Sequence, residues 1–155
     1  MKKILIRYAL PEDYKEVEEI MKQVQQLHID LRPDVYKPVD VVLPYEEFEK
    51  EIQEKTFLVA EYDGNVVGIL SYMCRHVEAD KRVTRDTIFI DCLAVEEKYR
   101  GKGIGHRLLD FAKNIVQEKG FDGLELQVNA KNIHAKKMYE SYGFAEMSIN
   151  MELSK

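Results

Sequence analysis

The sequence has no tryptophan and only two cysteines, Cys74 and Cys92, among 155 residues. Two thiols cannot form the disulfide framework that small secreted proteins use in place of a large core. Both cysteines lie in apolar-rich segments, so we expect two reduced thiols in the core. Long apolar runs are also missing, since the longest, Val66–Leu70, is far short of the roughly 18 residues that a membrane-spanning helix requires. We therefore expect a cytoplasmic protein with no membrane segment.

Metal-binding and nucleic-acid-binding patterns are missing as well. The four histidines form no H-E-x-x-H motif and no Cys/His ligand series, so we expect no metal site. The net charge is −5, from 28 acidic and 23 basic residues, and the chain therefore lacks the basic excess typical of a nucleic-acid-binding protein. A cationic small substrate is compatible with this charge.

The chain is long enough to build one complete core and shows neither repeats nor linkers, which predicts a single domain over residues 1–155. Apolar spacing predicts a helix that begins at Pro11 and reaches Leu27, and a second helix that follows Pro44. A β-hairpin is expected at the Asp63-Gly64 turn, and a charged loop is expected over residues 75–85. Residues 29–44 are expected to form an irregular connection.

The second half of the chain alternates strands and helices. Strands are expected over residues 4–8, 56–62, 65–74, 87–95 and 124–128, and over 147–153, where apolar residues alternate. Helices are expected over residues 103–119 and from Asn132 to Gly143. The segment 87–95 is nearly continuously apolar, as in a central strand buried on both faces. This order predicts an α/β fold with a mixed sheet and helices on both faces.

The connection between the central strand and the next helix carries the strongest functional signal. It reads Arg100-Gly101-Lys102-Gly103-Ile104-Gly105. Glycines let the backbone approach a ligand, and the N-terminus of the following helix attracts anions, so we expect a phosphate site here. The alternative is a basic surface turn that only joins strand to helix. Two common phosphate loops are excluded, because His106 stands where the nucleotide P-loop requires Lys and where the dinucleotide fingerprint requires its third glycine.

This hexapeptide resembles the signature of the GNAT superfamily of N-acetyltransferases, which is Arg or Gln, two residues, Gly, any residue, then Gly or Ala. The resemblance continues from Thr87 to Phe144, with an Asn at 132, a Tyr at 139 and the Gly143-Phe144 ending. It implies the family's fold, a central, mostly antiparallel sheet whose two central strands splay apart, with helices on both faces.

The resemblance also implies acetyl-coenzyme A as co-substrate. Its pyrophosphate is expected on the backbone of the loop Arg100, Gly101, Lys102, Gly103, Ile104 and Gly105. Its pantetheine arm is expected beside the strand end Leu93, Ala94 and Val95. Asn132 matches a position that contacts pantetheine, although it is also a good helix N-cap, and the two roles are compatible.

Two candidate catalytic residues follow from the same resemblance. Tyr139 matches the tyrosine that protonates the departing thiolate, and its alternative role is packing on the apolar face of its helix. Asp91 is the one charged residue between Thr87 and Val95, and a carboxylate in a buried strand is costly without a partner. Many members have Glu there as the base, so Asp91 is expected to be the base or the anchor of the ammonium group, or else a structural carboxylate.

The expected activity is transfer of an acetyl group to a primary amine of a small molecule or peptide by direct attack in a ternary complex. The alternatives are a coenzyme A-binding sensor without transferase activity and an acetyltransferase of protein N-termini, as in ribosomal proteins. Twelve residues, Phe144 to Lys155, follow Gly143, which is too few for the two-stranded hairpin of many members. One side of the acceptor groove is therefore expected to be open or completed by a partner subunit in a homodimer.

Overall fold

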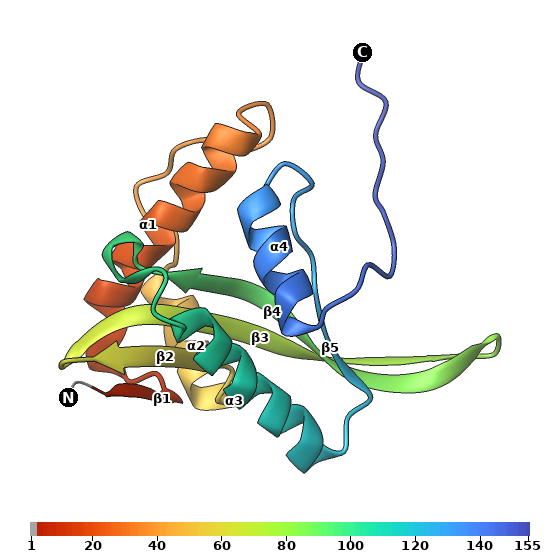
Figure 1. The fold of residues 1–155 in the computed structure, drawn as a ribbon, viewed down its shortest axis with the longest axis horizontal. Helices are drawn as coiled ribbons and strands as arrows, with labels where there is room; N and C mark the ends of the chain where they lie inside the picture. The colour runs from red at the N-terminus through yellow and green to blue at the C-terminus, as the bar shows by residue number, and fades with distance from the viewer. Residues whose placement is uncertain (1–2) are drawn as a thin grey trace.

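The computed structural model describes residues 3–155, which form a five-stranded sheet with the strand order β1-β2-β3-β4-β5 (Figure 1). The strands are β1 (Ile4–Tyr8), β2 (Phe57–Tyr62), β3 (Asn65–Ala79), β4 (Arg82–Val95) and β5 (Gly123–Leu126). The first four pair antiparallel, and β4 pairs parallel with β5. The mixed, mostly antiparallel sheet that the sequence predicts is confirmed.

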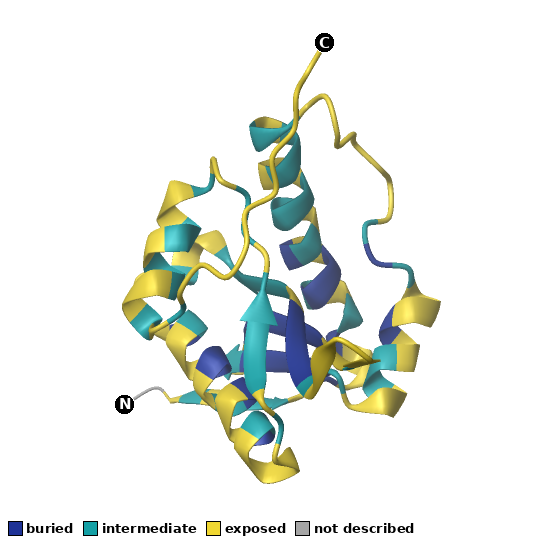
Figure 2. Cartoon of the chain, turned by 90° about the vertical axis from the view of Figure 1, so that its right-hand side faces the viewer, coloured by how far each residue is buried: buried dark blue, intermediate teal, exposed yellow. Residues whose placement is uncertain are grey.

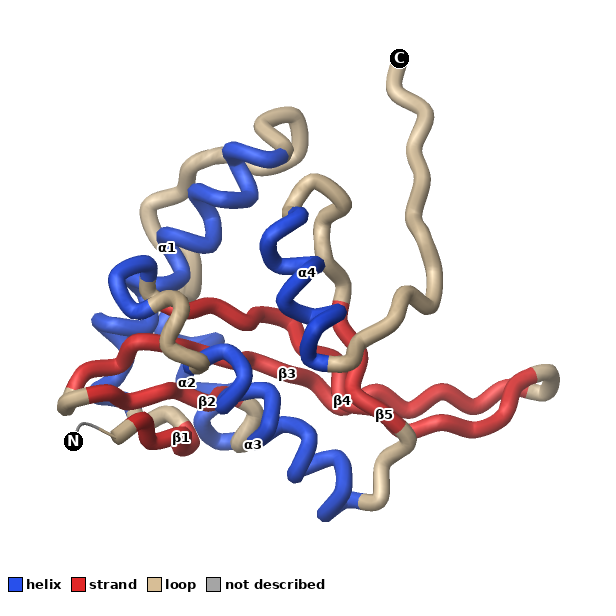
Figure 3. The backbone as a smooth tube through the Cα atoms, viewed as in Figure 1, coloured by secondary structure: helices blue, strands red, loops and turns tan. Residues whose placement is uncertain are grey.

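Helices cover both faces of this sheet, as the backbone tube shows (Figure 3). They are α1 (Tyr14–Leu31), α2 (Tyr45–Glu54), α3 (Ile104–Lys119) and α4 (Ile133–Tyr142). Val17 and Ile20 of α1 and Phe48 of α2 are buried in one apolar cluster on one face. Leu108 and Ala112 of α3 belong to the cluster on the other face, against which α4 also packs. Each amphipathic helix thus buries its apolar stripe against the sheet.

The long hairpin of β3 and β4 differs from the expected loop over residues 75–85. Both strands continue to a turn at Asp80 and Lys81 and project beyond the helices (Figure 1). Because neither face of this projection packs on a helix, charged residues are tolerated on both of its sides. Its register is supported by a contact of 2.7 Å between His76 Nδ1 and Asp86 Oδ1. Cys74, which was expected in the core, lies at the start of this projection and is exposed.

The strand expected over residues 147–153 is not formed. The backbone there is extended but belongs to no strand of the described residues, and the side chains of this segment are exposed (Figure 2). The alternating pattern is that of a strand, yet a strand also requires a partner edge. The prediction of a strand over residues 147–153 was therefore wrong.

Candidate active site

The connection between β4 and α3 forms an open loop at the start of a helix. Gly101 and Gly103 both have φ of 80°, a left-handed conformation that favours glycine, and a Cβ at either position would meet nothing within 4 Å. The first hydrogen bond of the helix ladder runs from the Arg107 N–H to the Gly103 oxygen at 3.1 Å. The N–H groups of Ile104, Gly105 and His106 precede that bond and lie at the positive end of the helix dipole. This geometry suits an anion.

Arg100 lies differently from the five loop residues that follow it. Its N–H donates to the Glu97 oxygen at 3.4 Å, within the 3-10 turn Glu97–Tyr99, and its Nε donates to the Val95 oxygen at 3.1 Å. The Arg100 side chain therefore fastens the loop to the end of β4. Its terminal guanidinium nitrogens are the part that remains for a ligand.

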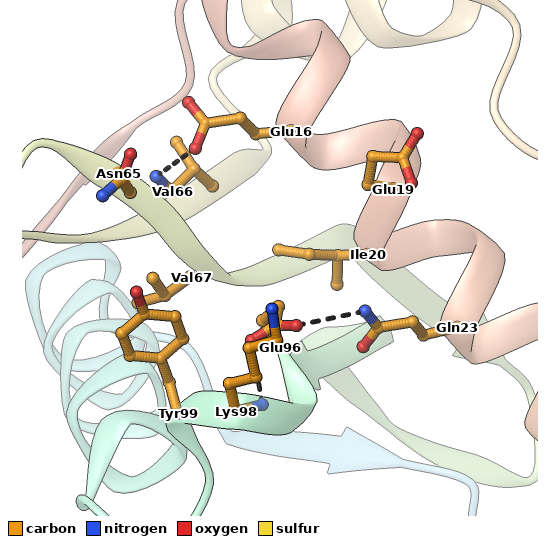
Figure 4. A pocket seen from close by; sticks show the side chains of 10 residues that line it. All are labelled: Glu16, Glu19, Ile20, Gln23, Asn65, Val66, Val67, Glu96, Lys98 and Tyr99. Atoms are coloured by element: carbon orange, nitrogen blue, oxygen red, sulfur yellow. Dashed lines mark hydrogen bonds between the residues drawn. The ribbon is translucent and has the colours of Figure 1, made fainter.

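The other side of this loop is tied to α1 around a cavity of about 300 Å³ (Figure 4). Gln23 Nε2 donates to Glu96 Oε1 at 3.4 Å, and Gln23 Oε1 accepts from the Glu97 N–H at 3.3 Å. Glu96 also accepts from the Lys98 N–H at 2.9 Å. Gln23 and Glu96 thus hold the turn that precedes the glycine loop against α1.

The strands β4 and β5 part before β4 ends. Their parallel pairing covers Thr87 to Ile90 on β4 and stops at Leu126 on β5, whereas β4 continues to Val95. Leu93, Ala94 and Val95 pair with β3 on their other side. Within residues 3–155, no strand pairs with this end of β4 on the β5 side, so its edge is available to an extended ligand. The predicted splaying of the central strands is confirmed.

Asp91 occupies a β-bulge in the middle of β4. Cys92 pairs with Ser71 and Ile90 with Tyr72, so Asp91 is the extra residue between two consecutive pairs. The expectation of a carboxylate inside a buried strand was wrong, because only residues 87–90 of the segment are buried and Asp91 is exposed. The bulge turns its side chain toward a cavity of about 560 Å³ beside α2.

Carboxylates from α2 share this cavity with Asp91. The cavity is lined by Glu47, Glu51 and Glu54 together with one lysine, Lys50. Glu51 accepts a short hydrogen bond from the Ser71 hydroxyl. Burial raises the pKa of Glu51, and the nearby charge of Asp91 adds to that rise against the opposing effect of Ser71. Sequence reasoning missed Glu51, because it lies in a run of acidic residues that is typical of a solvated helix face.

Cys92 follows Asp91 in β4, and its thiol interacts with Glu51 and Tyr139. Burial raises the pKa of Cys92 to about 12, with further contributions from Asp91 and Glu51. Burial also raises the pKa of Tyr139 to about 12, and the charge of Cys92 contributes. Both groups therefore stay protonated at neutral pH. Tyr139 thus lies near the residue that follows Asp91, although 47 residues stand between Asp91 and Tyr139 in the sequence.

The helix α4 that carries Tyr139 lies beside the start of α3. Met138 is 3.8 Å from a Cβ built on Gly105, and the Tyr142 ring meets His106 with centroids 5.4 Å apart. Asn132 Oδ1 accepts from the Ala135 N–H at 3.2 Å, which confirms the expected N-cap. Asn132 thereby fixes the first turn of α4.

Residues 3–155 contain neither a membrane-spanning helix nor a cluster of metal ligands. None of their helices combines the length and apolar character needed to cross a membrane. Nowhere in this part of the chain do three or more His, Cys, Asp or Glu side chains form a group that could hold a metal ion.

A glycine loop at a helix N-terminus, reached from a strand that has parted from its neighbour, is the arrangement that the resemblance to the N-acetyltransferases implies. The model of the acetyltransferase (GNAT) family matches residues 21–144, and the chain belongs to this family.

Solved structures share this architecture. A mutant of the BH1408 protein from Bacillus halodurans superimposes with a TM-score of 0.94 at 26% identity, over 97% of this chain and 99% of that one. The aminoglycoside N-acetyltransferase AAC(6')-Iy, in complex with CoA, superimposes with a TM-score of 0.73 over 97% of this chain and 98% of that one. At 16% identity, the second likeness shows the fold alone.

Curated relatives are similar over a part of their length. N-acetylaspartate synthetase of Homo sapiens is 37% identical over 95 residues, which is 59% of this chain and 28% of that protein. Spermine/spermidine N(1)-acetyltransferase of Bacillus subtilis is 27% identical over 95 residues, which is 59% of this chain and 62% of that protein. The matched region thus spans less than two thirds of either relative.

Proposed function

We propose that this chain is one N-acetyltransferase domain that transfers the acetyl group of acetyl-coenzyme A to a primary amine of a cationic acceptor. The observation that carries the proposal is the parting of β4 from β5 after Ile90, followed ten residues later by the glycine loop that begins at Arg100 and leads into α3. The unpaired edge of β4 suits an extended thioester arm. The glycine loop that follows it along the chain suits the diphosphate at the other end of that arm.

In this proposal, the diphosphate binds the backbone N–H groups between Gly101 and Gly105, at the positive end of the α3 dipole. The left-handed glycines leave that side of the loop open. The pantetheine amides pair with the edge of Leu93, Ala94 and Val95, as an added strand would. The Asn132 side-chain amide is available to the same arm as a donor.

The acidic cavity is the proposed acceptor site. An alkyl ammonium with a pKa near 10.4 is only about 0.04% neutral at pH 7, and the neutral amine is the form that attacks a thioester. Carboxylates attract the ammonium form and can take its proton directly or through water. Asp91 stands at the bulge nearest the parted strands and is the proposed base, while Glu51 is the proposed anchor of the cation.

The transfer is then a direct attack with no acyl-enzyme. A bond forms between the amine nitrogen and the acetyl carbon, the bond from that carbon to sulfur breaks, nitrogen gives up a proton, and sulfur gains one. Cys92 is not the nucleophile, because a thiol with a pKa of about 12 is almost entirely protonated at neutral pH.

Tyr139 is proposed to assist the departing sulfur. Its pKa of about 12 exceeds the roughly 8.5 of a free thiol, so complete proton transfer from the phenol would be uphill by about 5 kcal/mol. A hydrogen bond from the Tyr139 hydroxyl to the developing thiolate has no such cost and stabilises the charge as it forms. The proton that sulfur finally keeps balances the one that nitrogen loses.

The charge of the cavity distinguishes between the acceptors that the relatives' names indicate. Glu47, Glu51, Glu54 and Asp91 favour a polyamine, the class that the Bacillus subtilis relative's name specifies. The same carboxylates repel an amino dicarboxylate such as aspartate, the acceptor that the other name indicates. A polyamine is therefore the first acceptor to test.

The test measures thiol release from acetyl-coenzyme A with a panel of amines: spermidine, an aminoglycoside, aspartate and a peptide with a free N-terminus. We expect release that depends on the amine and is fastest with spermidine. Calorimetric titration with coenzyme A measures cofactor binding separately. Tight binding without release on any amine would instead indicate a sensor, and no binding at all would refute the proposed cofactor site.

A further inference from the structure

Lys50 is the one lysine among residues 3–155 that lines the acidic cavity beside Asp91. It lies on α2 together with Glu47, Glu51 and Glu54. Residues three and four positions apart on a helix share one face, so the Lys50 side chain and the three carboxylates of α2 border the same cavity. A primary amine of the chain itself therefore lies in the site that is proposed for an acceptor amine.

The Lys50 side chain is held only weakly. Its Nζ lies 4.0 Å from Glu54 Oε1, and the side chain is 73% exposed. An exposed ion pair of this kind contributes little, and a lysine side chain has a flexible four-carbon stem. Glu51, by contrast, accepts the short hydrogen bond from the Ser71 hydroxyl. Rotation of the Lys50 side chain toward Asp91 therefore costs little, while the carboxylate of Glu51 stays in place.

The cavity offers Lys50 the same groups that it offers a bound acceptor. Asp91, the proposed base, lines this cavity from the bulge of β4. The proposed path of the thioester arm, along Leu93 to Val95, begins two positions after Asp91 in the same strand. An amine on α2 thus stands beside both the base and the acetyl donor whenever no acceptor separates them.

We propose that Lys50 is a site of self-acetylation, at which the side-chain amine takes the acetyl group of the acetyl-coenzyme A bound to the same chain. This inference rests on the proposed function, because it uses the same donor and the same base. A bond forms between Lys50 Nζ and the acetyl carbon, and the bond from that carbon to sulfur breaks. The nitrogen gives up a proton to Asp91, directly or through water, and the sulfur of coenzyme A gains one.

Acetylation of Lys50 changes the charge of the acceptor site. An acetylated lysine is neutral, so the four carboxylates Glu47, Glu51, Glu54 and Asp91 then border the cavity with no cation among its lining side chains. Glu54 also loses its partner on α2. A cationic acceptor should therefore bind about two- to fivefold more tightly, which is the effect of one exposed charge.

The first test follows acetylation of the protein incubated with acetyl-coenzyme A alone, by mass spectrometry of its peptides. We expect Lys50 to gain an acetyl group at least about ten times faster than Lys22. Lys22 is the matched control, because it lies on α1 outside the cavity, is 50% exposed and pairs with Glu19 at 3.8 Å. It therefore reports direct chemical acetylation. The fraction of Lys50 modified per minute should not depend on protein concentration, since the step occurs within one chain.

The second test compares the KM for spermidine, or for whichever free amine is acetylated fastest, before and after this incubation. The KM of the wild-type protein should fall about two- to fivefold. Incubation should not change the KM of Lys50→Arg, which keeps the positive charge but offers no amine to acetylate. Lys50→Gln is neutral like acetyl-lysine, and it should show the lower KM without incubation.

Each contrary result has a distinct meaning. Equal acetylation of Lys50 and Lys22 overturns the inference, and so does a fractional rate that rises with protein concentration. A KM that ignores acetylation overturns its effect on the acceptor. If free amines are acetylated while Lys50 stays unmodified, this inference fails and the proposed function stands. If the chain neither binds coenzyme A nor releases thiol with any amine, the proposed function itself fails.

Discussion

Replacing Tyr139 by phenylalanine removes one hydroxyl at the proposed position of the departing sulfur. A hydrogen bond to a charged group contributes about 1.5–3 kcal/mol, which corresponds to a fall in kcat of about 10- to 100-fold. The structure gives this hydroxyl no hydrogen-bond acceptor among residues 3–155, so Tyr139→Phe should change the free energy of unfolding little. The KM for acetyl-coenzyme A should also change little, because the hydroxyl acts on charge that develops during the reaction.

Tyr142→Phe is the matched control, one turn further along α4. The Tyr142 hydroxyl donates to Asp110 Oδ1 at 2.7 Å, so its removal should cost about 1 kcal/mol of stability and leave kcat unchanged. Steady-state kinetics and thermal unfolding of both variants separate the two effects. In addition, a pKa of about 12 predicts that Tyr139 imposes no fall in kcat between pH 8 and 10. The reasoning is refuted if Tyr139→Phe keeps the wild-type kcat, or if both variants lose kcat equally.

Three other perturbations test the site. Asp91→Asn should lower kcat/KM at least about 10-fold and alter its pH profile, since general bases contribute about 100-fold or more; an unchanged profile would leave Asp91 without a catalytic role. Gly68→Ala places a Cβ 3.0 Å from Ile104 Cγ2 and 3.2 Å from Leu108 Cδ1, so it should cost about 1–3 kcal/mol and raise the KM for acetyl-coenzyme A by displacing the first turn of α3. A lower Tm with an unaltered KM would show that α3 stays in place. Iodoacetamide at pH 8 should alkylate exposed Cys74 well before Cys92. The reason is that the Cys92 pKa of about 12 leaves about one thiol in ten thousand ionised at this pH. Equal labelling of the two cysteines, measured by mass spectrometry of the peptides, would contradict this.

The sequence predicts the order of strands and helices because each carries a local signal. Asp63 and Gly64 form the expected turn with φ of 53° and 80°, and Gly120 ends α3 in the left-handed conformation. The expectations that were wrong depend on contacts between distant residues. Residues 75–79 and 82–85 lie in strands because β3 and β4 pair beyond the helices, and residues 147–153 form no strand because no strand of the described chain pairs with them.

The candidate site shows the same division between local and distant information. The loop from Gly101 to Gly105 is a contiguous motif, and its open backbone has the conformation that its glycines predict. Glu51 has no such signal, since its place beside Ser71 and Asp91 depends on how α2 packs against the sheet. The exposure of Asp91 could not be predicted either, because a bulge is visible only in the register of two paired strands.

That additional residue also decides which way the rest of β4 faces. Ile88 and Ile90 belong to the cluster under α3, and Leu93 and Val95 pack against that same cluster, whereas Cys92 and Ala94 pack under α1. Even numbers thus face one helix layer before Asp91 and the opposite layer after it. Deleting this one position would restore an unbroken alternation and leave every side chain on its present face, because Cys92 would then follow Ile90 directly and still pair with Ser71. The ladder between β3 and β4 therefore does not need Asp91, and its deletion should remove the carboxylate while both apolar clusters keep their β4 side chains.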